Sequence, residues 1–299
     1  MNTDNLGSCL ITGSGGFVGS RLTEYLGQHF VDLTSLGREN SHDIKHFNCD
    51  YLKESIPLNS LQGIDTVFHL AGLAHDTNNK SAEKEYKRIN SEFTLELAKL
   101  ALKSNVKRFI YLSSVKVSNI EGVSHKKYID IYARSKLEAE QLLQEACLHS
   151  PMSVKILRSS LVYGPGMKGN LEKLQTAIGK GWFPKLTLES NKRSMIHVDD
   201  LVRALVFISN KDFEKKYLEV SDGLSYSSKN IYDRVAQSTE VTGKFLRLPE
   251  VLFTILKKIP YLNNSFDKIY GDDYHECFDI FNLGFKPKLR LNNLNETIF

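Results

Sequence analysis

The chain has 299 residues, of which 41% are hydrophobic and 25% are charged, as is ordinary for a globular protein. This length suits one large α/β domain or two smaller ones that share a core. The formal net charge of +4, from 39 basic and 35 acidic residues, is too small to indicate nucleic-acid binding. It leaves room for a local basic pocket that takes an anionic ligand.

The four cysteines are far apart and show no CxxC spacing; they are Cys9, Cys49, Cys147 and Cys277. With no secretory signature, we expect reduced thiols in a cytoplasmic protein. The amino terminus lacks a basic segment before its apolar stretch, so we expect no signal peptide. The apolar segment 251–259 is too short to span a membrane; we expect a surface helix there, with membrane docking as the alternative.

Short apolar, β-branched segments alternate with amphipathic ones in the first half of the chain. The short segments predict strands over 8–12, 30–36, 65–71, 107–113 and 153–159, with a further strand ahead of Asp50. The amphipathic segments predict helices near 17–28, 82–104 and 131–149. Strands that alternate with helices indicate βαβ units, so the predicted fold class is α/β with a doubly wound parallel sheet.

The pattern loosens after residue 165. It predicts helices near 170–180, 198–210, 228–239 and 249–258, and a strand over 216–220. The tail 271–291 carries scattered aromatic residues and little periodicity. We therefore predict a first domain over 1–165, with a return segment near 195–225, and a smaller carboxyl-terminal lobe over 166–299.

The segment 11–20, "ITGSGGFVGS", carries Gly13, Gly16 and Gly19 between a predicted strand and a predicted helix. A tight turn from strand to helix needs glycine, and close approach of the backbone to a pyrophosphate excludes a Cβ atom. The helix amino terminus, with Phe17 and Val18 in its first turn, offers N–H groups and a positive dipole to the phosphates. This context predicts a Rossmann-type loop that binds a dinucleotide cofactor.

The cofactor is expected to be NAD or NADP, and the sequence leaves that choice open. Arg38 follows the second predicted strand, where an aspartate or glutamate that holds the adenosine ribose is often found. An arginine there can accommodate the 2′-phosphate of NADP, or it stacks on the adenine or points to solvent. Asp50, with Tyr51 beside it, can accept a hydrogen bond from the adenine amino group, or it caps a turn.

Tyr132 and Lys136 stand four residues apart in "YARSK", on one face of a predicted helix. A free phenol titrates near pH ~10, and a neighbouring ammonium lowers this pKa, which makes the tyrosine usable as an acid or a base. The alternative is an ordinary aromatic residue that packs beside a lysine with a buried stem.

Six motifs occur in order along residues 8–201: "TGSGGFVG" (12–19), "VFHLAG" (67–72), "YLSSVKV" (111–117), "YARSK" (132–136), "LRSSLVYGPG" (157–166) and "RSMIHVDDL" (193–201). Through them the chain resembles the extended short-chain dehydrogenase/reductase family, particularly its nucleotide-sugar epimerase and reductase branch. The resemblance implies an NAD(P)-binding Rossmann domain over 1–165 and a mainly substrate-binding lobe over 166–299.

The resemblance also implies residue roles. Tyr132 transfers the proton, Lys136 lowers its pKa and hydrogen-bonds the nicotinamide ribose, and Ser114 orients the substrate oxygen. Ser113 is the less favoured serine for that role, and we expect it to bind substrate; a plain turn is the alternative for both serines. Asn90 matches a helix asparagine that supports the site through backbone contacts and water, unless it is a polar residue on a solvated face.

Further cofactor-binding positions follow from the same motifs. Ala71 and Gly72 would line the cofactor groove after the fourth strand. Ser160, next to Ser159, would lie after the sixth strand, where the nicotinamide amide should rest. Relatives often carry prolines or aromatic residues at this last position, so the two serines depart from the family pattern.

The sugar nucleotide is expected to meet a second set of residues. Arg193 matches the family's arginine that grips the diphosphate, which suits a guanidinium, although it could be an ordinary surface arginine. Asn170 matches a residue that reaches the diphosphate and the sugar, and Trp182 or Phe183 would pack at the uracil site. Lys116 could reach an acyl or carbonyl oxygen of the substrate, or it pairs with a nearby carboxylate.

No metal site is predicted. The segment 41–50 holds His42, Asp43, His46 and Asp50, but their spacing is not that of a zinc site, and the expected chemistry needs no metal.

We expect an NAD(P)-dependent enzyme that epimerises C4 of a UDP-hexose or UDP-N-acetylhexosamine through a 4-keto intermediate. An NADPH-dependent 4-reductase of a UDP-4-keto-6-deoxy-N-acetylhexosamine, acting in surface-polysaccharide synthesis, is the first alternative, and Arg38 favours it. A catalytically inactive NAD(P)-binding sensor is the second alternative, although such proteins usually lack the tyrosine or the lysine of the Tyr132–Lys136 pair.

A 4,6-dehydratase is not expected, because that reaction needs an acid and a base directly after the catalytic hydroxyl, where Val115 and Lys116 stand. The expected partner is a nucleotide sugar, with no nucleic acid and no membrane span. By analogy, a homodimer would form through the helices near 82–104 and 131–149.

Overall fold

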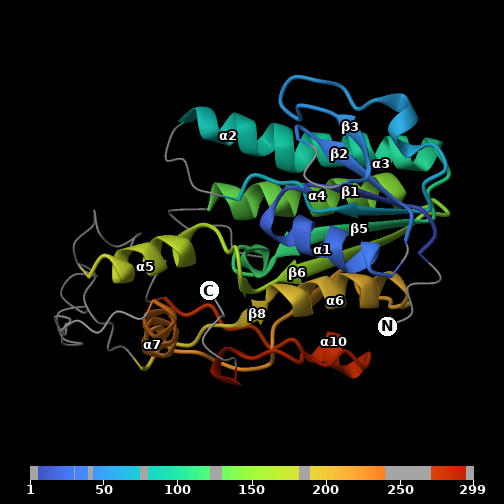
Figure 1. The fold of residues 1–299 in the computed structure, drawn as a ribbon. Coiled ribbons are helices and arrows are strands. Elements are labelled where there is room, and N and C mark those ends of the chain that lie inside the picture. The colour runs from blue at the N-terminus through green and yellow to red at the C-terminus, as the bar shows by residue number, and fades with distance from the viewer. Residues whose placement is uncertain are drawn as a thin grey trace. The chain divides into compact units, whose positions relative to one another are not determined.

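A computed structural model describes residues 6–29, 31–39, 43–74, 80–121, 130–181, 189–239 and 271–293 (Figure 1). The chain divides into two compact units. Unit 1 comprises Met1–Ser159, Leu201–Val220 and Asp279–Phe285, and unit 2 comprises Ser160–Asp200, Ser221–Phe278 and Lys286–Phe299. The first stretch of unit 1 thus ends at residue 159, whereas the sequence predicted 165. The segment Asp279–Phe285, near the carboxyl terminus, also belongs to unit 1.

Unit 1 is built on a seven-stranded parallel sheet in the order β3-β2-β1-β4-β5-β6-β9. Its strands are β1 Cys9–Thr12, β2 Leu33–Gly37, β3 Lys45–Asn48, β4 Thr66–His69, β5 Arg108–Ser114, β6 Ser153–Ser159 and β9 Leu218–Val220. The order reverses at β1, so the loops after β1 and β4 meet at the carboxyl edge, where such sheets bind ligands. The predicted doubly wound α/β fold is confirmed.

The helices of unit 1 are α1 Phe17–Gly27, α2 Lys80–Tyr86, α3 Phe93–Lys103, α4 Ile131–Cys147, most of α6 Val198–Ser209, and most of α10 Phe278–Asn282. The predicted helix over 82–104 is present, but a π-helical turn at Lys87–Glu92 separates α2 from α3. Helices α3 and α4 cover one face of the sheet, and α1 lies on the other (Figure 1).

The core between the sheet and the α3–α4 face is apolar. It includes Leu10, Val67, Phe109 and Ile156 from the strands, and Leu97 from α3. Each of these side chains is at most 1% exposed, so each gains the full burial contribution of about 1.5–3 kcal/mol. This core fixes the strand ends, from which the candidate site is built.

Unit 2 contains a parallel pair of three-residue strands, β7 Leu161–Tyr163 and β8 Met195–His197, which the sequence did not predict. The predicted helices α5 Asn170–Gly179 and α7 Ser228–Ser238 are confirmed, and a 3₁₀ turn covers Leu291–Asn293. The helix expected near 249–258 lies outside the described residues.

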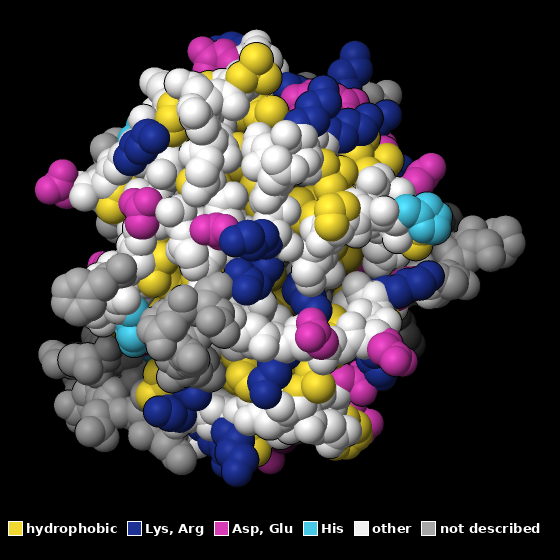
Figure 2. All heavy atoms as spheres, turned by 90° about the vertical axis from the view of Figure 1, so that its right-hand side faces the viewer, with side chains coloured by type: hydrophobic (Ala, Val, Ile, Leu, Met, Phe, Trp, Pro, Cys, Tyr) yellow, Lys and Arg dark blue, Asp and Glu magenta, His cyan; other side chains and the backbone are white. Residues whose placement is uncertain are grey.

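The described surface carries both signs of charge. On the face shown in Figure 2, basic and acidic side chains are interspersed, in keeping with the net charge of +4. Within the described ranges, no helix is long and apolar enough to cross a membrane, and no three His, Cys, Asp or Glu side chains come together to hold a metal ion. All four cysteines are buried and unpaired as disulfides.

A depression of about 410 Å³ is lined by Leu58, Asn59, Gln62, Gly63 and Ser104. These residues precede β4 and β5, so they lie at the amino edge of the sheet, opposite the loop that follows β1. None of the lining side chains is charged. The depression therefore offers no acid or base, and the candidate site must be sought at the carboxyl edge.

Candidate active site

The glycine loop between β1 and α1 leaves no room for side chains. Gly13 has φ +73°, and a Cβ atom there would lie 2.9 Å from the backbone nitrogen of Ala71. A Cβ atom on Gly19 would lie 2.0 Å from the Gly13 carbonyl oxygen, which accepts the Gly16 N–H at 2.9 Å. Gly16 precedes α1 without a side-chain cap, so the N–H groups of the first turn, including that of Phe17, are not taken by a capping side chain.

Tyr51 fastens this loop to the neighbouring strand. Its hydroxyl donates to the Leu36 carbonyl at 2.6 Å and accepts the Gly13 N–H at 3.4 Å. The ring lies 4.3 Å from that of Phe93, and burial raises the pKa of the phenol. Tyr51 therefore supports the glycine loop by joining Gly13 to the end of β2.

Asp50 and Arg38 occupy the ends of β3 and β2. The Asp50 carboxylate accepts the backbone N–H of Leu52 at 3.0 Å and lies 3.7 Å from Lys53 Nζ. This geometry is that of a turn-capping aspartate, which is the alternative that the sequence left open. Arg38 is exposed directly after β2, where either NAD or NADP would present its adenosine ribose.

The expected catalytic residues come together at the carboxyl end of β5. Ser114 ends that strand, and its hydroxyl is near enough to the Tyr132 phenol, in the first turn of α4, to lower the pKa of that phenol. Asp130 caps α4 by accepting the Tyr132 N–H at 3.0 Å. One turn later on α4, Lys136 Nζ donates to the Leu112 carbonyl at 2.9 Å. Ser114, Tyr132 and Lys136 therefore all lie at the carboxyl end of β5.

The pKa values of this set are governed by burial. Burial raises the pKa of Tyr132 to about 12, and the hydrogen bond with Ser114 partly offsets this rise. Burial also lowers the pKa of Lys136 to about 8, with Glu140 acting in the opposite direction. Lys136 is not among the groups that shift the Tyr132 pKa, so the lowering that the i, i+4 spacing suggested is not found, and desolvation of the phenolate dominates.

Gly72 lies against both Asn90 and Lys136. Asn90 lies in the π-helical turn; its Oδ1 accepts the Leu73 N–H at 2.7 Å, and its Nδ2 donates to the Leu73 carbonyl at 3.0 Å and to Ser135 Oγ at 2.9 Å. A Cβ atom on Gly72 would lie 3.1 Å from Lys136 Nζ. Asn90 thus joins the backbone that follows β4, at Leu73, to the Ser135 side chain of α4.

Ser113 and Lys116 flank Ser114 but have other partners. Ser113 is buried and donates to Glu140 Oε1 at 2.5 Å, so its hydroxyl is directed away from Ser114 and the expected substrate role has no support in the geometry. Lys116 pairs with Asp130 at 2.9 Å. Its Nζ lies 5.5 Å from the centre of the Tyr132 ring, so it remains a second cation beside the tyrosine.

The sequence did not predict a buried series of hydrogen bonds that runs through Thr12, His69 and Thr94. His69 Nδ1 lies 2.7 Å from Thr12 Oγ1, and His69 Nε2 lies 2.7 Å from Thr94 Oγ1. Thr12 also accepts the Ala71 N–H at 3.1 Å, and Thr94 donates to the Asn90 carbonyl at 2.6 Å. Burial lowers the pKa of His69, so the ring is neutral. The only signal in the sequence was a set of polar residues within apolar segments.

The remaining expected residues belong to unit 2. Ser160 is buried, and Asn170 is exposed at the first turn of α5. Arg193 is half-buried; its N–H and carbonyl each pair with Tyr226 at 2.9 Å, and the acidic Asp273 faces it. Burial lowers the pKa of Arg193. Trp182, Phe183 and His42 lie outside the described residues.

A parallel, doubly wound sheet with a glycine loop after its first strand, and with serine, tyrosine and lysine gathered after β5, defines an extended short-chain dehydrogenase/reductase. Residues 9–220 match the NAD dependent epimerase/dehydratase family, and the chain belongs to that family. This membership confirms the predicted enzyme class and its nicotinamide cofactor.

Individual relatives narrow the comparison. The chain is 31% identical over 281 residues to UDP-glucose 4-epimerase of Vibrio cholerae, covering 88% of this chain and 85% of that protein. It is 27% identical to MoeE5, solved in complex with UDP-glucose and NAD, with a TM-score of 0.67 over 77% of this chain and 81% of that one. A UDP-N-acetylglucosamine 4-epimerase from Methanobrevibacter ruminantium shares the fold, with a TM-score of 0.76 at 20% identity over 97% and 96% of the two chains.

Proposed function

We propose that this protein is a nucleotide-sugar 4-epimerase that uses NAD to interconvert UDP-hexoses or UDP-N-acetylhexosamines through a 4-keto intermediate. The observation that carries the proposal is that Ser114, the Tyr132 phenol whose pKa this serine lowers, and Lys136, which donates to the Leu112 carbonyl, gather at the carboxyl end of β5. The similarity to a UDP-glucose 4-epimerase over most of both chains supports the same reaction class.

The residues present fit a dinucleotide. The tight approach of Gly19 to the Gly13 carbonyl and the uncapped start of α1 form a cradle that any Cβ atom would fill. Gly13, Gly16 and Gly19 would hold the pyrophosphate there, and Lys136 the nicotinamide ribose. Held there, the nicotinamide of NAD would supply the hydride acceptor and donor for C4 of the sugar.

Residues of the chain itself would transfer the proton to and from the C4 oxygen of the sugar. Tyr132, with its pKa at about 12, is protonated at neutral pH and can give its proton to the C4 oxygen when a 4-keto sugar is reduced. In the opposite direction it takes that proton from the C4 hydroxyl. Ser114 would hold the C4 oxygen, and the ammonium of Lys136 would favour the transient phenolate.

Substrate recognition is proposed for two residues of unit 2. The half-buried guanidinium of Arg193 suits a diphosphate, because guanidinium binds phosphate oxygens in bidentate fashion. Asn170, at the first turn of α5, is proposed to reach the same group or the sugar. A homodimer through α3 and α4 likewise stays a prediction.

One observation favours a second candidate, an NADPH-dependent 4-reductase of a UDP-4-keto-6-deoxy-N-acetylhexosamine. Arg38 is exposed immediately after β2, where a guanidinium can pair with the 2′-phosphate of NADP. An epimerase keeps its cofactor through the cycle, whereas a reductase must exchange it after each turnover. The two candidates therefore differ in what copurifies with the protein.

The test is to denature purified protein, identify the nucleotide released, and assay interconversion of UDP-glucose with UDP-galactose and of UDP-GlcNAc with UDP-GalNAc. Copurified NAD with interconversion of either pair is the expected result. An empty site, a preference for NADPH and no epimerisation would transfer the assignment to the reductase. Tyr132→Phe should lower turnover by about 10²–10⁴-fold while NAD still binds, and Tyr25→Phe on α1 should retain turnover.

A further inference from the structure

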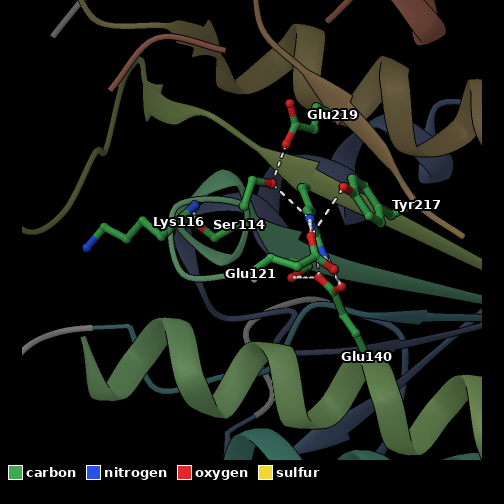
Figure 3. A network of polar contacts seen from close by, with 9 residues as sticks. Ser114, Lys116, Glu121, Glu140, Tyr217 and Glu219 are labelled. Carbon is green, nitrogen blue, oxygen red and sulfur yellow. Dashed lines mark hydrogen bonds and ion pairs between the residues drawn. The ribbon is translucent and has the colours of Figure 1, made fainter. Parts of the chain in front are cut away.

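A buried carboxylate that the proposed mechanism does not use lies one turn after Lys136. Glu140, only 2% exposed, follows Lys136 by four residues on α4, so the two side chains share a helix face. Its Oε1 accepts the Ser113 hydroxyl at 2.5 Å and Arg158 Nε at 3.0 Å, and its Oε2 accepts Arg158 Nη2 at 2.6 Å. These bonds hold Glu140 as an anion in a fixed position (Figure 3).

Arg158 is shared among several acids. The cluster around it holds one guanidinium and three carboxylates, those of Glu140, Glu121 and Glu219, and so keeps a net negative charge. Its Nη1 donates to Glu121 Oε2 and to Ser118 Oγ, each at 2.8 Å, and the guanidinium lies 3.3 Å from the centre of the Tyr217 ring. Ser118 in turn donates to Glu219. One guanidinium therefore serves two carboxylates directly and a third through a hydroxyl, and Glu140 is not fully neutralised by it.

The other groups that face Lys136 are neutral. From β5, the Tyr111 ring lies 4.6 Å from Lys136 Nζ, and burial raises the pKa of that phenol well above its usual range. From β4, His69 is neutral, because burial and then the charge of Lys136 lower its pKa. On α4 itself, Tyr132 is protonated at neutral pH. The carboxylate acting on Lys136 among the described residues is Glu140.

We propose that Glu140, fixed by Arg158 and Ser113, is a positioning residue that keeps Lys136 protonated at neutral pH. The proposal deepens the function proposed above and rests on it for the catalytic value of a charged Lys136. The physical reason is that burial disfavours the ammonium, whereas a nearby anion favours it. With the pKa of Lys136 already lowered to about 8, a further lowering by about one unit on loss of that anion would leave about half of the amine neutral at pH 7.

The same carboxylate links this charge to the geometry of the site. Ser113 precedes Ser114, and Arg158 stands opposite Ser113 in the register of β5 and β6. Glu140 therefore ties α4, which carries Tyr132 and Lys136, to the strand end that carries Ser114. A change that keeps the shape of Glu140 but removes its charge separates the electrostatic role from this structural one.

The experiment follows the ¹³Cε resonance of Lys136 against pH in protein with ¹³C-labelled lysine, assigned by its absence in Lys136→Arg. Glu140→Gln should lower the titration midpoint by about one pH unit, whereas Glu140→Asp, which alters the geometry but keeps the charge, should stay near the wild type. Glu121→Gln removes an acid from the same arginine on the side away from Lys136, and should also leave the midpoint unchanged.

A Glu140→Gln protein that is folded by circular dichroism and titrates like the wild type would overturn the proposal. If that variant does not fold, Glu140→Gln/Arg158→Gln removes the buried charge pair together, and a smaller lowering is expected because loss of the guanidinium offsets part of the loss of the anion. The readout needs no turnover, so a shifted midpoint without any sugar interconversion in the wild type would refute the proposed function alone. With turnover, the alkaline limb of kcat should move to lower pH in Glu140→Gln only.

Discussion

Tyr51→Phe tests whether one buried hydroxyl holds the glycine loop in shape. The substitution keeps the ring contact with Phe93 and removes both the bond to the Leu36 carbonyl and the acceptor for the Gly13 N–H. The 3.4 Å contact is long and contributes little, so the loss comes mainly from the 2.6 Å bond. Leaving a buried carbonyl without its donor costs about 1–3 kcal/mol.

The expected result is a fall of about 1–3 kcal/mol in the free energy of unfolding, measured by urea titration, which is about a fivefold to 150-fold change in the folding constant. Because Gly13 begins the phosphate cradle, calorimetry should show weaker NAD binding, while kcat at saturating NAD should change little. Tyr25→Phe is the control, since Tyr25 lies on α1 beyond the loop. An unchanged urea midpoint together with unchanged NAD affinity in Tyr51→Phe would refute the reasoning.

Three further outcomes are expected. Gly19→Ala places a methyl group 2.0 Å from the Gly13 carbonyl, so NAD binding measured by calorimetry should be lost, and retained affinity would show that the loop has room to move. Lys136 has a folded pKa of about 8 against 10.5 unfolded, so the unfolded chain binds more protons between these values. The free energy of unfolding should therefore rise with pH by up to about 3 kcal/mol across that window, and urea titrations of Lys136→Met should lack that rise. NMR of reaction mixtures should show no 4-keto-6-deoxy product from a UDP- or dTDP-hexose, because Val115 is buried and Lys116 is paired with Asp130; formation of that product would contradict this assignment of acid and base.

The parts of the site that could be predicted are those where backbone geometry restricts the residue type. Gly13 and Gly19 are needed because no Cβ atom fits, and that constraint is visible in the sequence as glycine between a strand and a helix. The i, i+4 spacing of Tyr132 and Lys136 likewise places both on one face of α4. The expected helices α1 and α4 followed from the same periodicity.

The parts that could not be predicted depend on long-range burial. Spacing alone suggested that Lys136 lowers the pKa of Tyr132, but it carries no information on how deeply the phenol is buried. The opposite directions of Ser113 and Ser114 follow from strand alternation, but the partner of Ser113, Glu140, lies on a helix and is 27 residues away along the chain. The pair β7–β8 was missed because three-residue strands show no periodicity.

The π-helical turn at Lys87–Glu92 changes the phase of the long helical segment. A π turn inserts one extra residue into an α-helix, so the faces of α2 and α3 are offset by about 100° from those of one continuous helix. Because of that offset, Asn90 can face Leu73 and Ser135 while Phe93 and Leu97 enter the apolar core, all within two turns. Deleting one residue from this turn would restore α-helical phase and rotate Asn90 out of alignment with the core-facing residues, so the length of this segment, as much as its composition, keeps the polar support of the site and the packing of the sheet compatible.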